Sequence, residues 1–205
     1  MRKKRNSMSY LILVILWVLF YFLHSFLASL NIKRKIKGMM GRQYIWYRLL
    51  YSVFALFHLM VILIYAAGIP QSLLFDKSPF LTYLGYMGAA FGTIVLVRSL
   101  KYISGKKFLG VSPHDDLEDQ GNLVSKGVHS YIRHPIYAGL ILIFFGYFLY
   151  QPYPTSLVHL ALLLVYLPFG IYFEEKKLIS IYGKAYIRYQ KEVPSLIPYK
   201  RKRTA

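Results

Sequence analysis

The chain has 205 residues, 56% of them hydrophobic, and a formal net charge of +18. A soluble domain of this length rarely reaches that hydrophobic content, so we expect an integral membrane protein. Cysteine is absent, which excludes disulfides, thiolate metal sites and a cysteine nucleophile. The basic residues lie between apolar blocks and form no motif that reads nucleic acid, so we expect them to set membrane topology and contact anionic lipids, with no nucleic-acid partner.

Five apolar blocks predict five transmembrane helices, because about 20 residues are needed to cross a hydrocarbon core. In chain order the blocks cover about residues 8–30, 47–68, 79–100, 135–150 and 155–173. The fourth is short for a full crossing, so we expect local thinning of the bilayer there. The first follows a basic start and has no small-residue cleavage site, so we expect it to remain as an anchor.

The expected fold class is an all-α integral membrane protein that forms one domain over residues 1–205. We divide it into a three-helix part over 1–100 and a second part over 101–205. The second part holds a long catalytic loop, a helical hairpin and an amphipathic cytosolic tail. The hairpin follows from the short link at 151–154, whose two prolines leave the last two helices as antiparallel neighbours.

The distribution of Lys and Arg indicates which loops face the cytosol. The loops at 31–48 and 101–135 and the tail share one side and hold six, five and nine basic residues. The N-terminus and the 69–78 loop share the other side, with four and one. Because basic residues favour the cytosolic side, we expect an inner-membrane protein whose active site faces the cytosol, although the basic N-terminus then lies outside.

Two polar motifs bracket the last two apolar blocks. Arg133-His134-Pro135-Ile136-Tyr137 precedes them, and Glu174-Glu175 follows them. A helical hairpin returns the chain to the side it left, so both motifs should meet at one membrane boundary. Ionisable groups at membrane depth are candidates for function. The structural alternative is an interfacial anchor at Pro135 and a salt bridge from the glutamates to Arg133 or to nearby lysines.

Aromatic residues after the second motif predict a cover for a pocket. Tyr182, Tyr186 and Tyr189 stand at i, i+4 and i+7, so they share one helix face. We expect this face and the 101–135 loop to close a pocket lined by cations, carboxylates and rings. Such a pocket suits a ligand with a cationic centre, an amino-acid end and a flat base.

Taken together, these motifs resemble those of a known superfamily. They read Gly127-x-x-Ser130-Tyr131-x-Arg133-His134-Pro135-x-Tyr137-x-Gly139, Glu174-Glu175-x-x-Leu178, Tyr182-Gly183-x-x-Tyr186-x-x-Tyr189 and Val193-Pro194. The pattern is similar to that of the isoprenylcysteine carboxyl methyltransferase and phospholipid N-methyltransferase superfamily, whose members are small membrane enzymes that use S-adenosylmethionine. This match covers about residues 120–198. The stretches 24–29 and 47–51 are similar to the NnrU-like and methanethiol methyltransferase-like branch.

The resemblance implies a site for S-adenosylmethionine between the hairpin's cytosolic end and the tail. The residues that it implies for cofactor binding are Val124, Gly127, Tyr131, His134, Pro135, Tyr137, Glu174 and Glu175. The chain lacks the Gly-x-Gly loop of Rossmann methyltransferases, so the site would be of another kind. The candidate catalytic residues are Arg133, Glu175 and Tyr189, and no metal is expected. The acceptor is expected to be lipophilic or small and to carry a thiol, an amine or a carboxylate. Glu175 or a tyrosine would be the base where the acceptor is neutral.

Other polar residues leave alternatives open. His24 and His58 could ligate a haem in a non-enzymatic electron-transfer protein, or they could be buried polar contacts or part of an acceptor pocket. The cluster His114-Asp115-Asp116-x-Glu118-Asp119 could bind a divalent ion, although a solvated loop that balances nearby lysines is simpler. His159 is interpreted as a packing or lumen-facing residue. Gly85, Gly88 and Gly92 stand three and four apart, as in closely packed helices. A structural membrane subunit is a third possible function.

Overall fold

The computed structural model describes residues 2–118 and 121–199, and the regular structure within them is helical throughout. The prediction of an all-α protein is therefore confirmed. The elements are α1 Arg2–Ala28, α2 Leu30–Met40, the 3-10 helix η1 Gly41–Trp46, α3 Tyr47–Ala67, α4 Pro79–Leu100, α5 Gly105–Leu109, the 3-10 helix η2 Gly127–Ser130, α6 Pro135–Tyr150, α7 Pro154–Tyr182 and α8 Lys184–Glu192.

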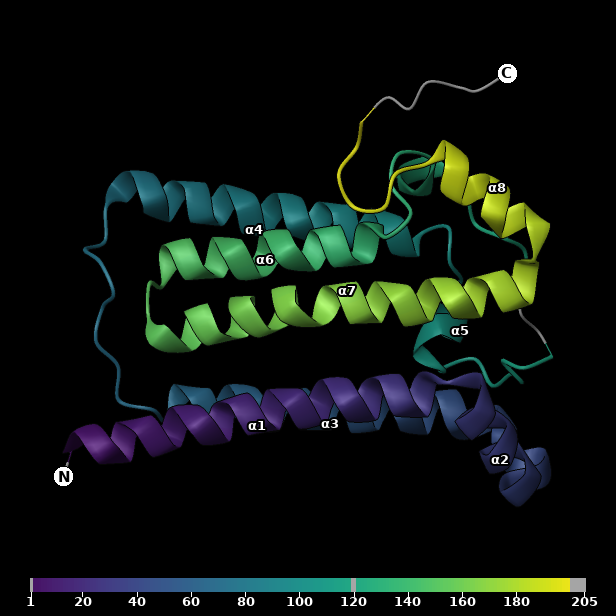
Figure 1. Cartoon of the computed structure of the whole chain (residues 1–205), viewed down its shortest axis with the longest axis horizontal. Helices are drawn as coiled ribbons and strands as arrows, with labels where there is room; N and C mark the ends of the chain where they lie inside the picture. The colour runs from purple at the N-terminus through teal and green to yellow at the C-terminus, as the bar shows by residue number, and fades with distance from the viewer. Residues whose placement is uncertain (1, 119–120, 200–205) are drawn as a thin grey trace.

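The long helices α1, α3, α4, α6 and α7 run side by side along one axis (Figure 1). Helix α4 packs against α6, α6 against α7, α7 against α1, and α1 against α3. Within the described ranges, four helical stretches are long and apolar enough to cross a membrane: Ser7–Ala28, Leu30–Ala67, Pro79–Leu100 and Pro154–Tyr182. Helix α6 is apolar but only 16 residues long, so it is the short member, as predicted.

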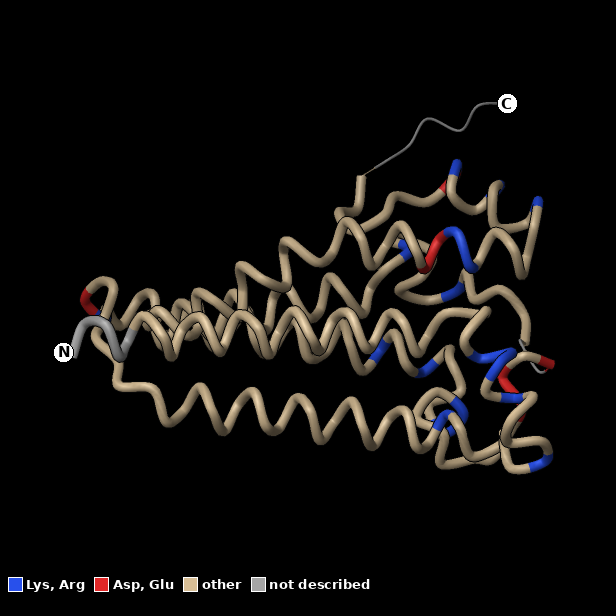
Figure 2. The backbone as a smooth tube through the Cα atoms, turned by 60° about the horizontal axis from the view of Figure 1, so that its bottom comes forward, with Lys and Arg blue, Asp and Glu red and all other residues tan. Residues whose placement is uncertain are grey.

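Charged residues gather at one end of this bundle. Lys and Arg cluster around α2, α5 and α8 (Figure 2), whereas the start of α1 and the link from α3 to α4 lie at the opposite end (Figure 1). The basic segments therefore share one end of the molecule, as the alternation of spans predicted. Which compartment that end faces stays a prediction.

The prolines mark the helix starts correctly. Pro79 and Pro135 each stand in the first turn of a helix, where the missing N–H is not needed. Ser78 caps α4, because its side chain accepts a hydrogen bond from the Leu81 N–H at 3.2 Å.

The predicted loop at 31–48 is wrong, since α2 and η1 occupy it. Lys33, Arg34, Lys35 and Lys37 lie on the amphipathic helix α2, a pattern that a topology count does not distinguish from a loop.

The boundary of the last span is also different from the prediction. Helix α7 continues to Tyr182, so Glu174 and Glu175 lie within a helix and not after its end. The expected amphipathic tail is not one continuous helix, because it is broken at Gly183, whose φ of 55° is a conformation that favours glycine. The chain turns there, and α8 folds back toward the first turn of α6 (Figure 1).

Glycines bring α4 and α6 into backbone contact. A Cβ on Gly92 would lie 2.6 Å from the carbonyl oxygen of Gly139, and a Cβ on Gly139 would lie 2.8 Å from that of Gly92. Gly85 meets Gly146 in the same way two turns along. The close packing predicted from the glycine spacing is confirmed, and this pairing holds the short α6 on the longer α4.

The other side of the hairpin packs on α1 through larger side chains. Trp17 is 2% exposed and donates its indole N–H to Nδ1 of His159 at 2.7 Å. Leu13 and Ile62 are buried beside it. His159 is thus a packing residue with a satisfied ring nitrogen. Bulky rings at this level fix the distance between α1 and α7, and the two helices enclose a cavity further toward the basic end.

Candidate functional site

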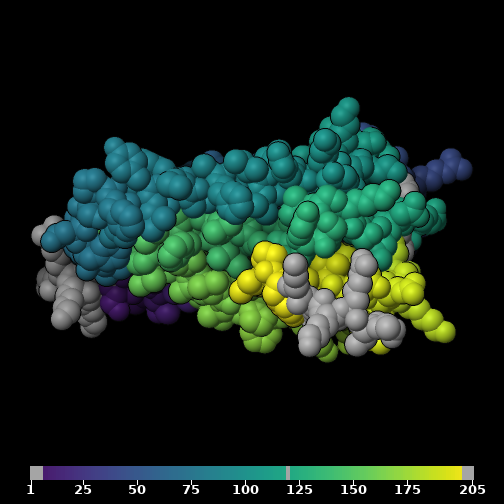
Figure 3. Space-filling view, turned by 90° about the horizontal axis from the view of Figure 1, so that it is seen from above, coloured from purple at the N-terminus to yellow at the C-terminus, as the bar shows by residue number. Residues whose placement is uncertain are grey.

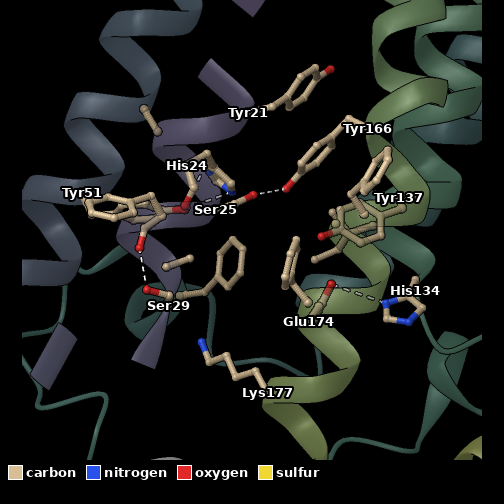
Figure 4. A pocket seen from close by; sticks show the side chains of 18 of the residues that line it. Tyr21, His24, Ser25, Ser29, Tyr51, His134, Tyr137, Tyr166, Glu174 and Lys177 are labelled. Atoms are coloured by element: carbon tan, nitrogen blue, oxygen red, sulfur yellow. Dashed lines mark hydrogen bonds and ion pairs between the residues drawn. The ribbon is translucent and has the colours of Figure 1, made fainter. Parts of the chain in front are cut away.

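The two polar motifs meet at the basic end of the hairpin, with His134 between the glutamates. Its Nε2 lies 3.0 Å from Oε1 of Glu175, and its Nδ1 lies 3.5 Å from Oε2 of Glu174. Figure 4 shows Glu174 reaching from α7 toward His134, with Tyr137 close by. The Tyr137 ring stacks on the imidazole at 5.7 Å between centroids. Because Pro135 starts α6 directly after His134, the imidazole is held at the foot of that helix.

Arg133 joins the hairpin to the tail. Its Nε and Nη2 bind Oε1 of Glu175 at 2.8 and 2.7 Å, and its Nη1 donates to the carbonyl of Gln190 at 3.1 Å. Glu175 also accepts from Nε2 of Gln190 at 2.9 Å. The Arg133 side chain is 9% exposed. These contacts give Arg133 and Glu175 a structural part in the site, and their expected catalytic roles stay predictions.

The tail clamps this cluster from outside. The backbone N–H groups of Arg133 and His134 donate to the carbonyls of Pro194 and Ser195 at 2.9 and 3.0 Å. Figure 3 shows this C-terminal segment, in yellow, lying against the green stretch around the start of α6. Tyr189 is 6% exposed, and its hydroxyl donates to the carbonyl of His129 at 2.6 Å.

Burial raises the pKa of Tyr189 to about 12, with the Arg133 charge acting in the opposite direction. A hydroxyl with that pKa is almost entirely protonated near neutral pH. The contacts of Tyr189 therefore suit a clamp better than a base. Tyr186 and Tyr189 are buried together and Tyr182 packs against them, but the three lie on two helices, α7 and α8, so the single helix face expected for them is wrong.

His134 is biased toward its charged form. Burial by itself lowers the pKa of His134, but the hydrogen bonds and charges of Glu174 and Glu175 outweigh it and raise the pKa above its ordinary value. Nearby His129 behaves in the opposite way, because burial lowers its pKa despite a contact of its Nε2 with the Ser99 carbonyl at 3.3 Å. The motif thus places an imidazole between two carboxylates that favour its charged form.

A cavity of about 1160 Å³ lies between the α1–α3 pair and the α6–α7 hairpin. Arg133, His134, Pro135, Tyr137 and Glu174 line its hairpin side. The opposite wall carries hydrogen-bonding side chains and rings, among them Tyr21, His24, Ser25 and Tyr51 (Figure 4). Arg48 and Phe108 also line the cavity. Binding sites for small molecules usually measure about 300–1,000 Å³, so this cavity has room for more than one small ligand.

Some of the residues expected to bind a cofactor do not line this cavity. Tyr131 is 68% exposed, and Gly127 packs against the ring of Tyr102 with a φ of 63°. Val124 is half-buried in the loop. Glu175 lines a smaller pocket of about 330 Å³ near Gln190. The roles expected for Val124, Gly127 and Tyr131 stay predictions, and the part of the set that faces the cavity is the proline motif with Glu174.

Several residues of the cavity wall were not predicted from the sequence. Tyr166, Gly170, Glu174 and Lys177 follow one another at spacings of four, four and three on α7, so they share the face that lines the cavity. The Tyr166 hydroxyl lies 2.8 Å from Oγ of Ser25 on α1. Counting back from Glu174 in helical steps would have found Tyr166, and counting forward would have found Lys177.

The histidines of the first two spans do not form the geometry expected for a haem. Both ring nitrogens of His24 lie within hydrogen-bonding distance of the Tyr51 hydroxyl, at 2.8 and 3.0 Å. The Phe20 ring lies against both imidazoles, 5.7 Å from His24 and 5.5 Å from His58. A haem held by both histidines would have to displace Phe20 and break the Tyr51 contact. Since His24 lines the cavity, the structure favours the acceptor-pocket interpretation.

The acidic loop balances nearby lysines, as expected, but its ion pairs fasten it to α2, so it is packed on that helix instead of being fully solvated. Asp116 binds the ammonium of Lys33, which is 3% exposed, and accepts from the Tyr44 hydroxyl at 2.8 Å. Lys37 pairs with Asp115 and Glu118. Asp119 lies outside the described residues, and among those described no group of three His, Asp or Glu could hold a metal ion. Burial acts to raise the pKa of Asp116, but the charge and hydrogen bond of Lys33 prevail and lower it.

Comparison with known proteins places these motifs in a family context. Methanethiol S-methyltransferase of Crocosphaera subtropica is 37% identical over 73 residues, which are 35% of this chain and 27% of that protein. Methanethiol S-methyltransferase 1 of Bradyrhizobium diazoefficiens is 36% identical over 36% of this chain and 25% of its own length. Protein-S-isoprenylcysteine O-methyltransferase of Schizosaccharomyces pombe is 35% identical over 37% of this chain and 33% of its own length.

The chain thus spans about a quarter to a third of the length of the curated relatives it matches. No solved structure matches it. A family model described as phospholipid methyltransferase matches residues 80–185, which is half of the chain and runs from α4 through the hairpin to the start of α8. With the proline motif and both glutamates inside the matched region, the chain belongs to the phospholipid methyltransferase family.

Proposed function

We propose that the chain is a membrane methyltransferase that uses S-adenosylmethionine, and that the cavity between α1–α3 and α6–α7 is its active site. The observation that carries this proposal is the arrangement of His134 between Glu174 and Glu175 at the cavity wall. Family membership supports the proposal, because the relatives that the chain matches are methyltransferases by name.

The residues present fit the chemistry of this cofactor. Glu174 is the acid that lines the cavity within the described chain, and it suits an ammonium group. The rings of Tyr137 and Tyr166 can face a sulfonium or a flat base. When bound, the cofactor supplies a methyl group on a positively charged sulfur.

The chain's own part in the reaction is to orient, to exclude water and to take a proton. The clamp from the tail holds His134, and His134 holds Glu174, so the carboxylate is fixed before a ligand arrives. An anionic acceptor needs no base. A neutral thiol or amine must lose its proton to a base. Glu175 is engaged by Arg133 and Gln190, and Glu174 can accept the proton only where it does not hold the ammonium of the cofactor.

The cavity walls suit an acceptor with an apolar part. Phe22 and Phe26 on α1 and Phe169 and Phe173 on α7 line the cavity and are exposed on the outer surface. A lipophilic acceptor can therefore reach the polar groups from the bilayer side, and a small thiol fits the same space.

We place the basic end in the cytosol, where a soluble cofactor is available.

Binding of S-adenosylhomocysteine, the demethylated product of the cofactor, tests the proposal. We would reconstitute the full chain in lipid nanodiscs and titrate it by calorimetry. We expect binding by the wild type and a loss of about tenfold or more in His134→Ala and Glu174→Gln, because each removes a group of the cavity wall. Glu192→Gln, on the exposed face of α8, is the matched control and should bind normally. Absence of binding by the folded wild type would overturn the function.

If the proline motif has only a structural role, the variants will lose thermal stability while the fraction that remains folded binds with unchanged affinity. That result would favour a structural membrane subunit and contradict the proposed site.

A further inference from the structure

The cavity carries more positive than negative charge. Its charged lining residues are the cations Arg48, Arg133, Lys176 and Lys177 and the acid Glu174. Arg133 is neutralised by Glu175, and Glu174 is engaged by His134. Neither Arg48 nor Lys177 forms an ion pair with another residue in the described part of the chain.

Arg48 is held in place by groups that leave its charge unneutralised. Its Nε donates to the carbonyl of Phe108 at 2.6 Å, and its guanidinium lies 4.8 Å from the centroid of the Phe108 ring and 5.4 Å from that of Tyr51. Gly110, with a φ of 78°, lets the turn after α5 approach the backbone at the start of α3 closely. The guanidinium is therefore oriented in advance, and its Nη atoms make no hydrogen bond to the described residues.

Lys177 enters the same cavity from the opposite helix. It lies one turn after Glu174 on α7, and Figure 4 shows its amine directed into the space between α7 and α1. The residue is half-buried, and its side-chain ammonium has no hydrogen-bond partner in the described chain. Lys33, which is buried nearby, shows the usual arrangement, since Asp116 neutralises it. A partly buried ammonium without an acid favours an anionic ligand, because burying an unpaired charge is unfavourable.

We propose that Arg48 on α3 and Lys177 on α7 form a binding subsite for the carboxylate or phosphate of a ligand held in the cavity, next to the wall of His134 and Glu174. A guanidinium presents paired N–H donors and an ammonium adds a mobile point charge, a combination that suits both oxyanions. The anion can belong to the amino-acid end of the cofactor or to the methyl acceptor. The assignment of the anion to the cofactor or to the acceptor rests on the proposed function. The binding of an anion by Arg48 and Lys177 does not.

The experiment compares charged and uncharged ligand pairs on matched variants. The variants are Lys177→Met, Arg48→Gln, the conservative Lys177→Arg, and Lys184→Met as a control at the start of α8, outside the cavity lining. The first pair is S-adenosylhomocysteine against methylthioadenosine, which lacks the amino-acid end. The second pair is dansylated undecanoate against its methyl ester, followed by fluorescence. Circular dichroism and gel filtration select the folded protein.

We expect Lys177→Met and Arg48→Gln to weaken one charged ligand about tenfold or more while its uncharged counterpart binds as before. Lys177→Arg and Lys184→Met should stay within about threefold of the wild type, a difference of under about 1 kcal/mol. A selective loss for S-adenosylhomocysteine assigns the subsite to the cofactor carboxylate, since removing a cation cannot weaken contacts to its ammonium. A selective loss for undecanoate assigns the subsite to an anionic acceptor.

Two results would overturn the subsite: unchanged affinity for both charged ligands, or an equal loss for charged and uncharged partners. Failure of the proposed function gives a different result. In that case the wild type binds neither adenosine compound, and the undecanoate pair still tests Arg48 and Lys177.

Discussion

The two faces of the α6–α7 hairpin are built in opposite ways. Toward α4, glycines bring the backbones of α4 and α6 together, and no space remains for a Cβ at Gly92 or Gly139. Toward α1 and α3, aromatic and polar side chains hold the helices apart and leave a cavity of about 1160 Å³. Close backbone contact gives one face rigidity through many dispersion contacts, and side-chain length gives the other face room.

This difference explains how a short helix can carry a site. Helix α6 has only 16 residues, yet its first turn holds Pro135 and Tyr137 at the cavity. Helix α4 fixes the position of α6 along its length, and the tail fixes the residues just before its first turn. The open face can then display polar groups whose geometry does not depend on a ligand.

The largest effect on stability is expected at the charged foot of the hairpin. Glu175→Ala leaves Arg133 largely buried without its carboxylate, and breaking a buried pair typically lowers the free energy of unfolding by about 3–5 kcal/mol. Denaturation in mixed micelles measures the change. The matched control is Glu192→Ala, whose partner Arg188 is 83% exposed, and it should change stability by less than about 1 kcal/mol. Equal effects would show that the Arg133 pair does not hold the tail.

A smaller loss is expected from filling the glycine interface. Gly92→Leu places side-chain atoms against the Gly139 carbonyl, and overpacking of this kind lowers the free energy of unfolding by about 1–3 kcal/mol. Gly38→Leu in α2 is the control, because nothing lies within 4 Å of a Cβ there. Thermal unfolding of both variants in detergent would show whether the α4–α6 contact is as rigid as its geometry indicates.

Substitutions on the open face of the hairpin, toward α1 and α3, should lower the free energy of unfolding by a smaller amount. Tyr166→Phe removes the hydrogen bond to Ser25 but keeps the ring stacked on Tyr21 at 4.1 Å, so we expect a loss of about 1 kcal/mol in unfolding free energy. Ser25→Ala should cost a similar amount, and the double variant should cost no more than either single one. Additive losses in this double-mutant cycle would contradict a direct hydrogen bond.

The smallest and most gradual effect concerns pH. Because the pKa of His134 is raised in the folded protein, its contribution to stability is complete below the ordinary histidine pKa of about 6.5 and is lost as pH rises through the raised value. We expect wild-type stability to fall across that window more steeply than that of His134→Gln. Denaturation midpoints measured at several pH values would show it. A wild-type curve that rises there would mean that His134 is neutral between the glutamates.

Several features of the site were predictable from local residue order. Pro135 placed the start of α6, and the short 151–154 link placed α7 beside it, so the meeting of His134 with Glu174 followed from the hairpin. The length of α7 was not predictable in this way. Charged residues after an apolar block mark the end of a membrane span, but a helix continues into water as long as no residue breaks it, and here Gly183 is that residue.

The opposite wall of the cavity shows more clearly what local residue order cannot predict. Arg48 and Tyr51 stood in a motif of the first half of the chain, and Lys177 stood among ordinary basic residues of the tail. Nothing in their order indicated that they line one space with Glu174. That proximity depends on how far α1 and α7 are held apart, and the rings of Trp17, Tyr21 and Tyr166 set the spacing through contacts between residues more than 100 positions apart.

The sequence by itself determined the membrane class, the helix starts at prolines, the glycine contact and the pairing of the two polar motifs, because each depends on spacing along one helix or one hairpin. Only the tertiary structure decided which charges remain unpaired. Whether a charge is neutralised depends on the distance between segments that are far apart in the sequence. Lys33 pairs with Asp116 and Arg133 pairs with Glu175. Arg48 and Lys177 line the cavity without an ion pair in the described chain.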